Sequence, residues 1–139
     1  MREILFRGKT KNRRDIAWIE GSLMRCIHMF DKEPTLYIYG FDTEVDGRGC
    51  IIDNYCGEEV IPETVGQFTG LFDKNGIAIF EGDIVKLDNS LDTKQKNFEV
   101  RFAYGQFYIG INQPVSYIRD SCEVIGNIHD NPELLEVSK

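Results

Sequence analysis

The sequence predicts an all-β protein that has only short helices. Two observations lead to this prediction: apolar and β-branched residues come in short runs, and glycine, asparagine and aspartate separate these runs. Short strands at this spacing are typical of a small barrel or sandwich. The 139 residues fit one domain or two small ones that share a core, and a chain of this size folds without metals or disulfides. The 42% hydrophobic content excludes collagen-like structure, coiled coil and wholesale disorder.

Residues 1–45 predict three strand segments. Residues 2–8 place the apolar run 4–6 between basic residues, as in a short strand. Residues 16–30 form a longer segment, in which Gly21 predicts a hairpin turn or a bulge. Residues 35–41 are rich in β-branched and aromatic side chains and predict a strand.

Turn-forming residues separate these strands from the segments that follow. Asp46–Gly47 predicts a turn before a strand that resumes at Cys50. Pro62 suits the first turn of a short helix, because its missing N–H has no intrahelical partner there in any case. Residues 73–76 predict a tight turn that ends on a glycine, the residue that takes a positive φ without steric penalty.

The second half predicts a more regular series of short strands. Phe98, Val100 and Phe102 alternate with charged residues, which predicts one buried and one solvated face. A polar loop is expected over 88–96 and a one-turn helix over 133–135. The remaining strands are expected at 77–80, 84–87, 107–111 and 122–128.

The charge distribution limits the classes of partner. The formal net charge is −7, which argues against a mainly electrostatic nucleic-acid binder. Residues 1–14 hold six cations and one carboxylate, a local +5, so the other residues carry ten cations and 22 carboxylates, or −12. An acidic body of this kind suits a basic protein partner.

The compartment is expected to be the cytoplasm. No segment approaches the roughly 20 apolar residues that span a bilayer, and the N-terminus lacks the hydrophobic stretch of a signal peptide. The even number of cysteines would permit two disulfides, but free buried thiols are the favoured interpretation in a chain that is not secreted. These cysteines are Cys26, Cys50, Cys56 and Cys122.

Three segments carry a family resemblance. They are MREILFRGK at 1–9, PETVGQFTGLFDKNGIAIFEGDIVKL at 62–87 and CEVIGNIHDNPELL at 122–135. With these segments in this order, the chain resembles the YopX family of small proteins encoded in bacteriophages and prophages. The resemblance implies an all-β fold with an SH3-like barrel over 62–139 and an N-terminal β subdomain over 1–61 packed on it. It implies no activity.

The residues that carry this resemblance are mostly turn formers, and we interpret them as structural. Asp73 and Asp83 are placed to accept backbone N–H bonds at turns, where the neighbouring glycines permit sharp bends. Two alternatives stay open: a partner-binding role, and a carboxylate cluster of Asp73, Glu81 and Asp83 that binds a hard cation through oxygen. The set comprises Thr69, Gly70, Asp73, Gly76, Glu81, Gly82, Asp83, Gly126 and Asn127.

The basic N-terminal segment is the best functional lead from sequence. Its charges either balance the acidic body in a solvated turn or form a patch that contacts nucleic acid or an acidic protein. The residues are Arg7, Lys9, Lys11, Arg13 and Arg14. A set of aromatic residues could stack on bases beside this patch, although aromatics at alternating positions more often form barrel core. This set is Trp18, Phe102, Tyr104, Phe107 and Tyr108.

Other groupings of reactive side chains are weak. Cys26, His28, Cys50 and Cys56 could in principle bind zinc, but no paired Cys-x-x-Cys spacing supports such a site. His129 and Asp130 occur near Glu123, yet adjacent strand residues point to opposite faces and no nucleophile is placed beside them. Single glycines provide no phosphate-binding loop.

The sequence therefore favours a non-enzymatic accessory protein without a cofactor. We expect it to act through protein contacts, self-association included, and not through a membrane. The alternative is a weak nucleic-acid-binding module that uses residues 7–14.

Overall fold

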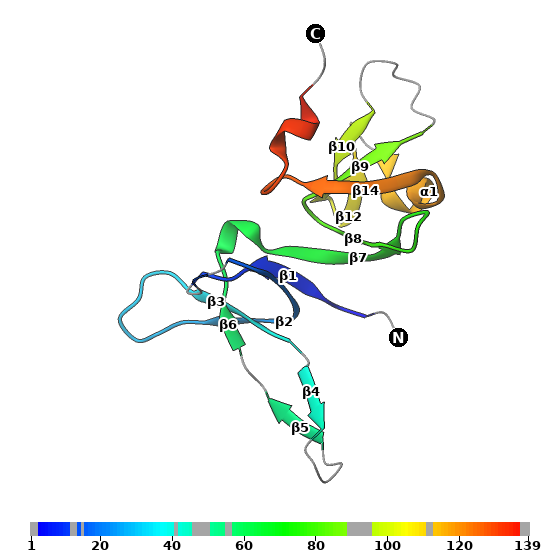
Figure 1. Cartoon of the computed structure of the whole chain (residues 1–139). Coiled ribbons are helices and arrows are strands. Elements are labelled where there is room, and N and C mark those ends of the chain that lie inside the picture. Colours follow the sequence, from blue (N-terminus) through cyan, green and yellow to red (C-terminus); the bar gives the residue numbers. More distant parts are fainter. Residues whose placement is uncertain are drawn as a thin grey trace. The chain divides into compact units, whose positions relative to one another are not determined.

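The computed structural model describes residues 3–11, 14, 16–40, 57–88, 96–110 and 113–136, together with the backbone of 42–45 and 51–54. Over these ranges the chain is mostly antiparallel β-structure, as predicted (Figure 1). It divides into two compact units, of which one is Ile4–Gly66 and the other is built on Gln67–Lys139. Each unit is described below by itself.

The first unit is built on a four-stranded antiparallel sheet in the order β6-β3-β2-β1. Its sheet face with Gly8, Ile38 and Val60 is buried. A separate two-stranded pair, β4 with β5, and a 3-10 helix that begins at Pro62, as predicted, complete the unit. The strands are β1 (Phe6–Lys9), β2 (Trp18–Cys26), β3 (Thr35–Tyr39), β4 (Asp42–Val45), β5 (Ile51–Asn54) and β6 (Gly57–Glu59).

Gly21 is not a turn, and this corrects the sequence prediction. It lies inside the continuous nine-residue strand β2. A Cβ atom placed on Gly21 would lie 2.0 Å from the backbone oxygen of Tyr39. The sequence needs glycine here because β3 approaches the backbone of β2 too closely for any side chain, which is one of the recognised meanings of glycine within a strand.

The second unit contains three small sheets. β7 pairs with β8, the order β10-β9-β14 forms a second sheet, and the order β11-β12-β13 forms a third. A short helix α1 (Val115–Ile118) and a 3-10 turn (Arg119–Ser121) precede β14, and a 3-10 helix (Pro132–Leu135) follows it. The strands are β7 (Gly66–Phe72), β8 (Ala78–Phe80), β9 (Asp83–Leu87), β10 (Asn97–Glu99), β11 (Arg101–Ala103), β12 (Gln106–Ile109), β13 (Gln113–Pro114) and β14 (Cys122–Asn127).

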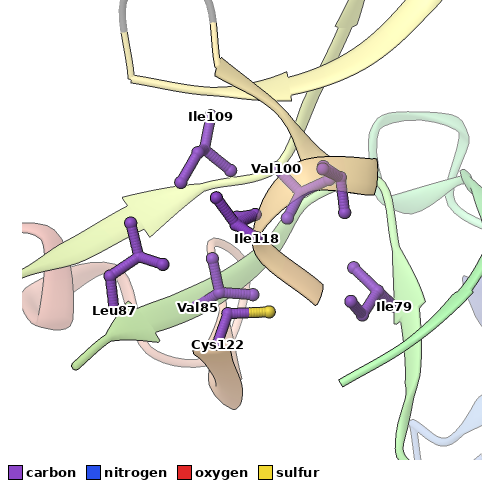
Figure 2. Packing of buried hydrophobic residues seen from close by; sticks show 8 residues of the cluster. Ile79, Val85, Leu87, Val100, Ile109, Ile118 and Cys122 are labelled. Carbon is purple, nitrogen blue, oxygen red and sulfur yellow. The ribbon is translucent and has the colours of Figure 1, made fainter. Parts of the chain in front are cut away.

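The core of the second unit draws residues from both three-stranded sheets and from α1. Figure 2 shows these side chains directed toward one another. Because they come from segments up to 43 positions apart in sequence, burial of this cluster holds the sheets together. The cluster is Ile79, Val85, Leu87, Val100, Ile109, Val115, Ile118 and Cys122.

The predicted alternation of Phe98, Val100 and Phe102 is wrong beyond Val100. The strand breaks there: β10 pairs with β9, whereas β11 pairs with β12. The N–H of Val100 donates to the Asp83 oxygen and the Val100 oxygen accepts from the N–H of Gly82, so the chain bends at a fully buried residue. Phe102 is consequently 49% exposed instead of buried.

Helix α1 was not expected from the sequence, while most strands were. The strands near 35–41, 77–80, 84–87 and 122–128 and the terminal helical turn are confirmed. The described strands form separate antiparallel sheets and no closed barrel, so the SH3-like assignment stays a prediction. The turn expected at Asp46–Gly47 and most of the polar loop 88–96 lie outside the described residues.

Replacement of Gly21 tests the close approach of β2 and β3. Gly21→Ala is expected to destabilise the protein by about 2–4 kcal/mol, because backbone atoms cannot move aside as a flexible side chain can. The matched control is Gly40→Ala, since the atom nearest a Cβ at Gly40 lies 3.4 Å away. Urea unfolding of both variants measures the difference, and equal losses would contradict the interpretation.

Candidate functional site

Asp73 is the centre of the turn between β7 and β8. Its Oδ1 accepts the N–H groups of Asn75 and Ile77, each at 2.9 Å, and its Oδ2 accepts the N–H of Val124 at 2.9 Å. Gly76 has φ +80°, the left-handed region that favours glycine. One carboxylate therefore closes the turn and also binds it to β14, 51 positions along the chain.

The electrostatics of Asp73 follow from these contacts. Burial by itself raises the pKa of the carboxyl, but the N–H donors of Val124, Ile77 and Asn75 outweigh burial and hold the pKa below its ordinary value of 3.8. The side chain is 6% exposed, so it is a buried anion whose charge is stabilised by backbone dipoles. That is the arrangement of a structural cap.

Asp83 has a similar role at the next turn. Its Oδ2 accepts the N–H of Phe80 at 2.7 Å, and the residue is 1% exposed. Gly82 has φ +88°, and its N–H and oxygen bond to Val100 and Ile128 respectively, while the N–H of Glu81 donates to Gln67. These contacts fasten the turn to three other segments of the second unit.

Thr69 and Gly70 shape an irregularity in β7. The Thr69 hydroxyl donates to the Ile79 oxygen at 2.8 Å and accepts the N–H of Leu71 at 3.2 Å. Gly70 has φ +83°, and the pairing with β8 shifts register between Phe68 and Phe72. The two residues therefore form a bulge that bends the strand.

Gly126 and Asn127 shape the end of β14. A Cβ at Gly126 would lie 2.5 Å from Oδ1 of Asn131. The Asn127 side-chain oxygen accepts the N–H groups of His129 and Asp130, which closes the following turn. Gly126 also lies at a shift in register between β14 and β9.

The alternative of a cation site gains no support from this geometry. Within the described ranges, no three His, Cys, Asp or Glu side chains gather in a way that could hold a metal ion. Asp73 and Asp83 instead direct their oxygens at backbone N–H groups.

The basic N-terminal residues make contacts inside the first unit. The guanidinium of Arg7 lies 4.9 Å from the centre of the Trp18 ring and the ammonium of Lys9 lies 5.5 Å from it, both within cation–π range. Lys11 Nζ lies 3.0 Å from Glu59 Oε1. Arg14 is exposed, and Arg13 lies outside the described residues.

The cysteines form no described site. Cys26 and Cys122 are free thiols, as the sequence favoured, and Cys122 is fully buried. Burial raises the pKa of the Cys122 thiol to about 11, which keeps it protonated and unreactive at neutral pH. His28 is exposed on the loop after β2, and Cys50 and Cys56 lie outside the described residues.

Sequence reasoning missed two exposed apolar sites. One is the β11–β12 hairpin, where Phe102 of β11 is 49% and Tyr104 of the turn is 99% exposed; the sequence favoured barrel core for both over a stacking surface. The other is the loop between β2 and β3, where Ile27, Met29 and Phe30 are exposed. A signal for the second was present, because residues 27–33 mix apolar and charged side chains without the period of a strand.

These features define the class of protein. It is a mostly β protein whose signature residues stabilise turns and bulges, and two of its hairpins carry exposed apolar side chains. None of the helices in the described ranges has the length and apolar character that a membrane crossing requires. The family model of the YopX protein matches residues 6–136, and the chain belongs to the YopX family.

One solved structure is similar over almost the whole chain. It is the crystal structure of protein EF1440 from Enterococcus faecalis, with 28% sequence identity and a TM-score of 0.59. The alignment covers 96% of this chain and 99% of that one. A comparison with curated proteins gives no match.

Removal of the Asp73 charge tests its structural role. Asp73→Asn is expected to cost about 2 kcal/mol, because the amide group would leave the N–H of Val124 without an acceptor. The pKa of Asp73 is lowered in the folded state, so its contribution is present above the unfolded pKa and is lost as the pH falls through the folded value.

Urea unfolding between neutral and acidic pH measures both effects. The difference in unfolding free energy between the parent and Asp73→Asn should shrink below about pH 4. Asp120→Asn is the control, because the Asp120 side chain is 94% exposed. A difference that stays constant with pH would exclude the ionised carboxylate as the source of stability.

Proposed function

We propose that this protein is a non-enzymatic phage or prophage accessory protein of the bacterial cytoplasm, which binds a protein partner through the tip of its β11–β12 hairpin. The observation that carries the proposal is Tyr104. It combines a φ of +53° with 99% exposure. A bulky residue at positive φ is an outlier, and such outliers concentrate at functional sites.

The hairpin turn would be more stable with another residue at this position. Ala103 pairs with Gln106, so Tyr104 and Gly105 are the two turn residues, and both have positive φ. Turns of this type favour Asn-Gly, and the left-handed conformation costs a tyrosine about 1–2 kcal/mol. Because its side chain gains no burial in return, a contact outside the chain accounts for an aromatic residue here.

The base of the hairpin is rigid enough to present such a contact. The rings of Phe102 and Phe107 pack with centroids 4.9 Å apart, and Phe107 packs on the core of the second unit. Tyrosine anchors of this kind are enriched among the residues that dominate protein–protein binding. A partner with an apolar pocket that also offers a hydrogen-bond acceptor for the phenol fits this tip.

The SH3-like architecture is part of the proposal and is supported by strand order. The chain passes from β9 to β10, bends at Val100 into β11, and continues through β12 and β13 to α1 before β14 returns beside β9. We propose that these two sheets, joined at the bend between β10 and β11 and followed by a helical turn before the last strand, correspond to the SH3-like barrel that the family resemblance implies. A fold by itself supports many functions, so the proposed protein binding depends on the hairpin tip and not on the architecture.

The absence of catalysis is proposed from how the buried carboxylates are used. Asp73 and Asp83 accept backbone hydrogen bonds at turns, and the buried Cys122 thiol is held protonated. The two carboxylates and the thiol therefore have structural roles, and we propose that the surface of the protein serves binding.

Nucleic-acid binding through residues 7–14 is the weaker alternative. The ion pair with Glu59 compensates the charge of Lys11, and the contacts with the Trp18 ring hold the cations of Arg7 and Lys9 against the first unit. We expect labelled single-stranded DNA and RNA to bind only at low salt. Fluorescence anisotropy across a salt series measures this, and binding that persists at physiological salt but is lost when Arg7, Lys9 and Lys11 are all changed to Gln would favour the alternative.

Tyr104→Asn tests the proposed function. The variant should be more stable than the parent by about 1 kcal/mol, because asparagine tolerates the left-handed conformation, yet it should lose the partner. Affinity capture from lysogenic cells, with chemical denaturation of the same proteins, measures both. Tyr117→Asn is the matched control, since Tyr117 is 82% exposed on α1 with an ordinary φ.

The outcomes test partner binding at the hairpin tip and backbone strain at Tyr104 separately. A partner that is retained by Tyr117→Asn and lost by Tyr104→Asn supports the proposal. A partner retained by both variants removes the hairpin tip as the binding site, and unchanged stability in Tyr104→Asn removes the strain argument.

A further inference from the structure

Sulfur and imidazole side chains are concentrated at the end of β2, where the chain enters the loop to β3 (Figure 1). Met24 and Met29, two of the three methionines of the chain, enclose Cys26 and His28. Met24 is 47% and Met29 is 90% exposed, His28 is exposed, and Cys26 is a partly exposed free thiol. One short segment therefore presents four side chains that can bind a soft metal ion.

Strand geometry places two of these donors on one face. Met24 and Cys26 are two apart in β2, and side chains two apart on a strand point to the same side. Arg25 between them points to the opposite side. Strand β3, which pairs with this part of β2, has no charged residue. No charged side chain of these two strands therefore separates the two sulfur atoms.

The spacing of the two sulfurs suits a single metal ion. Residues two apart on a strand lie about 6.6 Å apart. Metal–sulfur bonds of about 2.3 Å place two sulfurs no more than about 4.6 Å apart. The flexible side chain of methionine, with three rotatable bonds, covers a difference of about 2 Å. Met24 and Cys26 can therefore bind the same ion without a change in the strand.

A turn holds the other two donors next to the strand. The N–H of Asp31 donates to the oxygen of His28 at 3.0 Å, which closes a turn over residues 28–31. His28 is the first residue of this turn and Met29 is the second, shortly after the paired end of β2 at Cys26. Because all four donors are close in sequence, a metal ion that joins them closes only short loops and costs little chain entropy.

We propose that Met24, Cys26, His28 and Met29 form a binding site for copper(I). The Cys26 thiol loses its proton to the solvent and binds as the thiolate, so one Cu(I) ion replaces one proton and the charge of the chain is unchanged. The two thioether sulfurs and an imidazole nitrogen of His28 complete the site. The inference goes beyond the proposed function, because it uses none of the residues of the hairpin tip.

The set of donors identifies the metal. Thioether sulfur favours Cu(I), whereas zinc sites use thiolate, imidazole and carboxylate, and calcium and magnesium take oxygen ligands. No three His, Cys, Asp or Glu side chains cluster within the described ranges, and the proposed site needs no such cluster because methionine supplies half of its donors. The charges of Asp31, Lys32 and Glu33, which follow the site, sum to −1 and favour a cation over an anion.

Anaerobic titration of the full chain with Cu(I), in competition with the coloured chelator bathocuproine disulfonate, tests the site. The parent should take up a single Cu(I) ion per chain and should retain it against about a tenfold excess of Zn(II). X-ray absorption at the copper edge should show both sulfur and nitrogen neighbours, a readout that a merely structural role of these residues would not produce.

Replacements of similar size test the sulfur donors. Met24→Leu with Met29→Leu keeps the apolar surface and removes only the thioether sulfurs, so it should weaken Cu(I) binding by about tenfold or more. Cys26→Ser should weaken Cu(I) binding by about a hundredfold or more, because it removes the thiolate. Circular dichroism establishes that each variant is folded.

Matched controls test binding by the other thiols and the other histidine of the chain. Cys50→Ser with Cys56→Ser removes two cysteines that lie outside the described residues, and His129→Gln is the counterpart of His28→Gln. Both controls should bind Cu(I) as the parent does, whereas His28→Gln should bind it more weakly.

Four results would overturn the inference. These are a parent that takes no Cu(I) from the chelator, a Cu(I) affinity that is unchanged in Met24→Leu with Met29→Leu, Cu(I) binding that is lost in Cys50→Ser with Cys56→Ser, and displacement of Cu(I) by Zn(II). Tyr104→Asn should leave Cu(I) binding unchanged. Failure of the metal site and failure of partner binding at the hairpin are thus observed separately.

Discussion

The carboxylate of Asp73 accepts three backbone N–H groups from two parts of the chain that are 51 positions apart, and the second unit depends on this connection. Without this carboxylate, the N–H groups of Asn75 and Ile77 in the turn and the N–H of Val124 in β14 would lose the acceptor that they share. A charged acceptor is needed because each N–H bond to a carboxylate is stronger than a neutral one. The fixed turn in turn holds Ile79 of β8 against the core that β9, β12 and α1 complete.

Other residues of the family signature stabilise turns in the same way. Asp83, Thr69 and Asn127 each direct a side-chain oxygen to a nearby backbone group, while Gly70, Gly76 and Gly82 take the positive φ that sharp bends require. Short strands joined by such bends can cross one another closely and still satisfy their backbone hydrogen bonds. The signature residues therefore determine where this small β-structure bends. For this reason they predict the family and the fold far better than they predict an activity.

The surface features that suggest function depart from these local rules. Tyr104 occupies a position where asparagine would relieve strain, and Met29 and Phe30 occupy a loop where polar residues would be better solvated. Stability alone selects against both choices, and this is the physical basis on which we propose a contact at the hairpin tip. The two sites lie on different hairpins of different units, so each can be altered without changing the other.

The sequence by itself determined the all-β class, most strands, the turn at Asp73–Gly76 and the family, because period-two alternation, glycine and turn-forming side chains act over a few neighbouring residues. Tertiary structure alone decided the rest. The backbone of Tyr39 made Gly21 a strand residue, the bonds of Val100 to Gly82 and Asp83 bent the strand and exposed Phe102, and Trp18 and Glu59 engaged the basic residues that had been the leading functional candidates. Each of these outcomes depends on a partner that is distant in sequence, and local patterning carries no information about such partners.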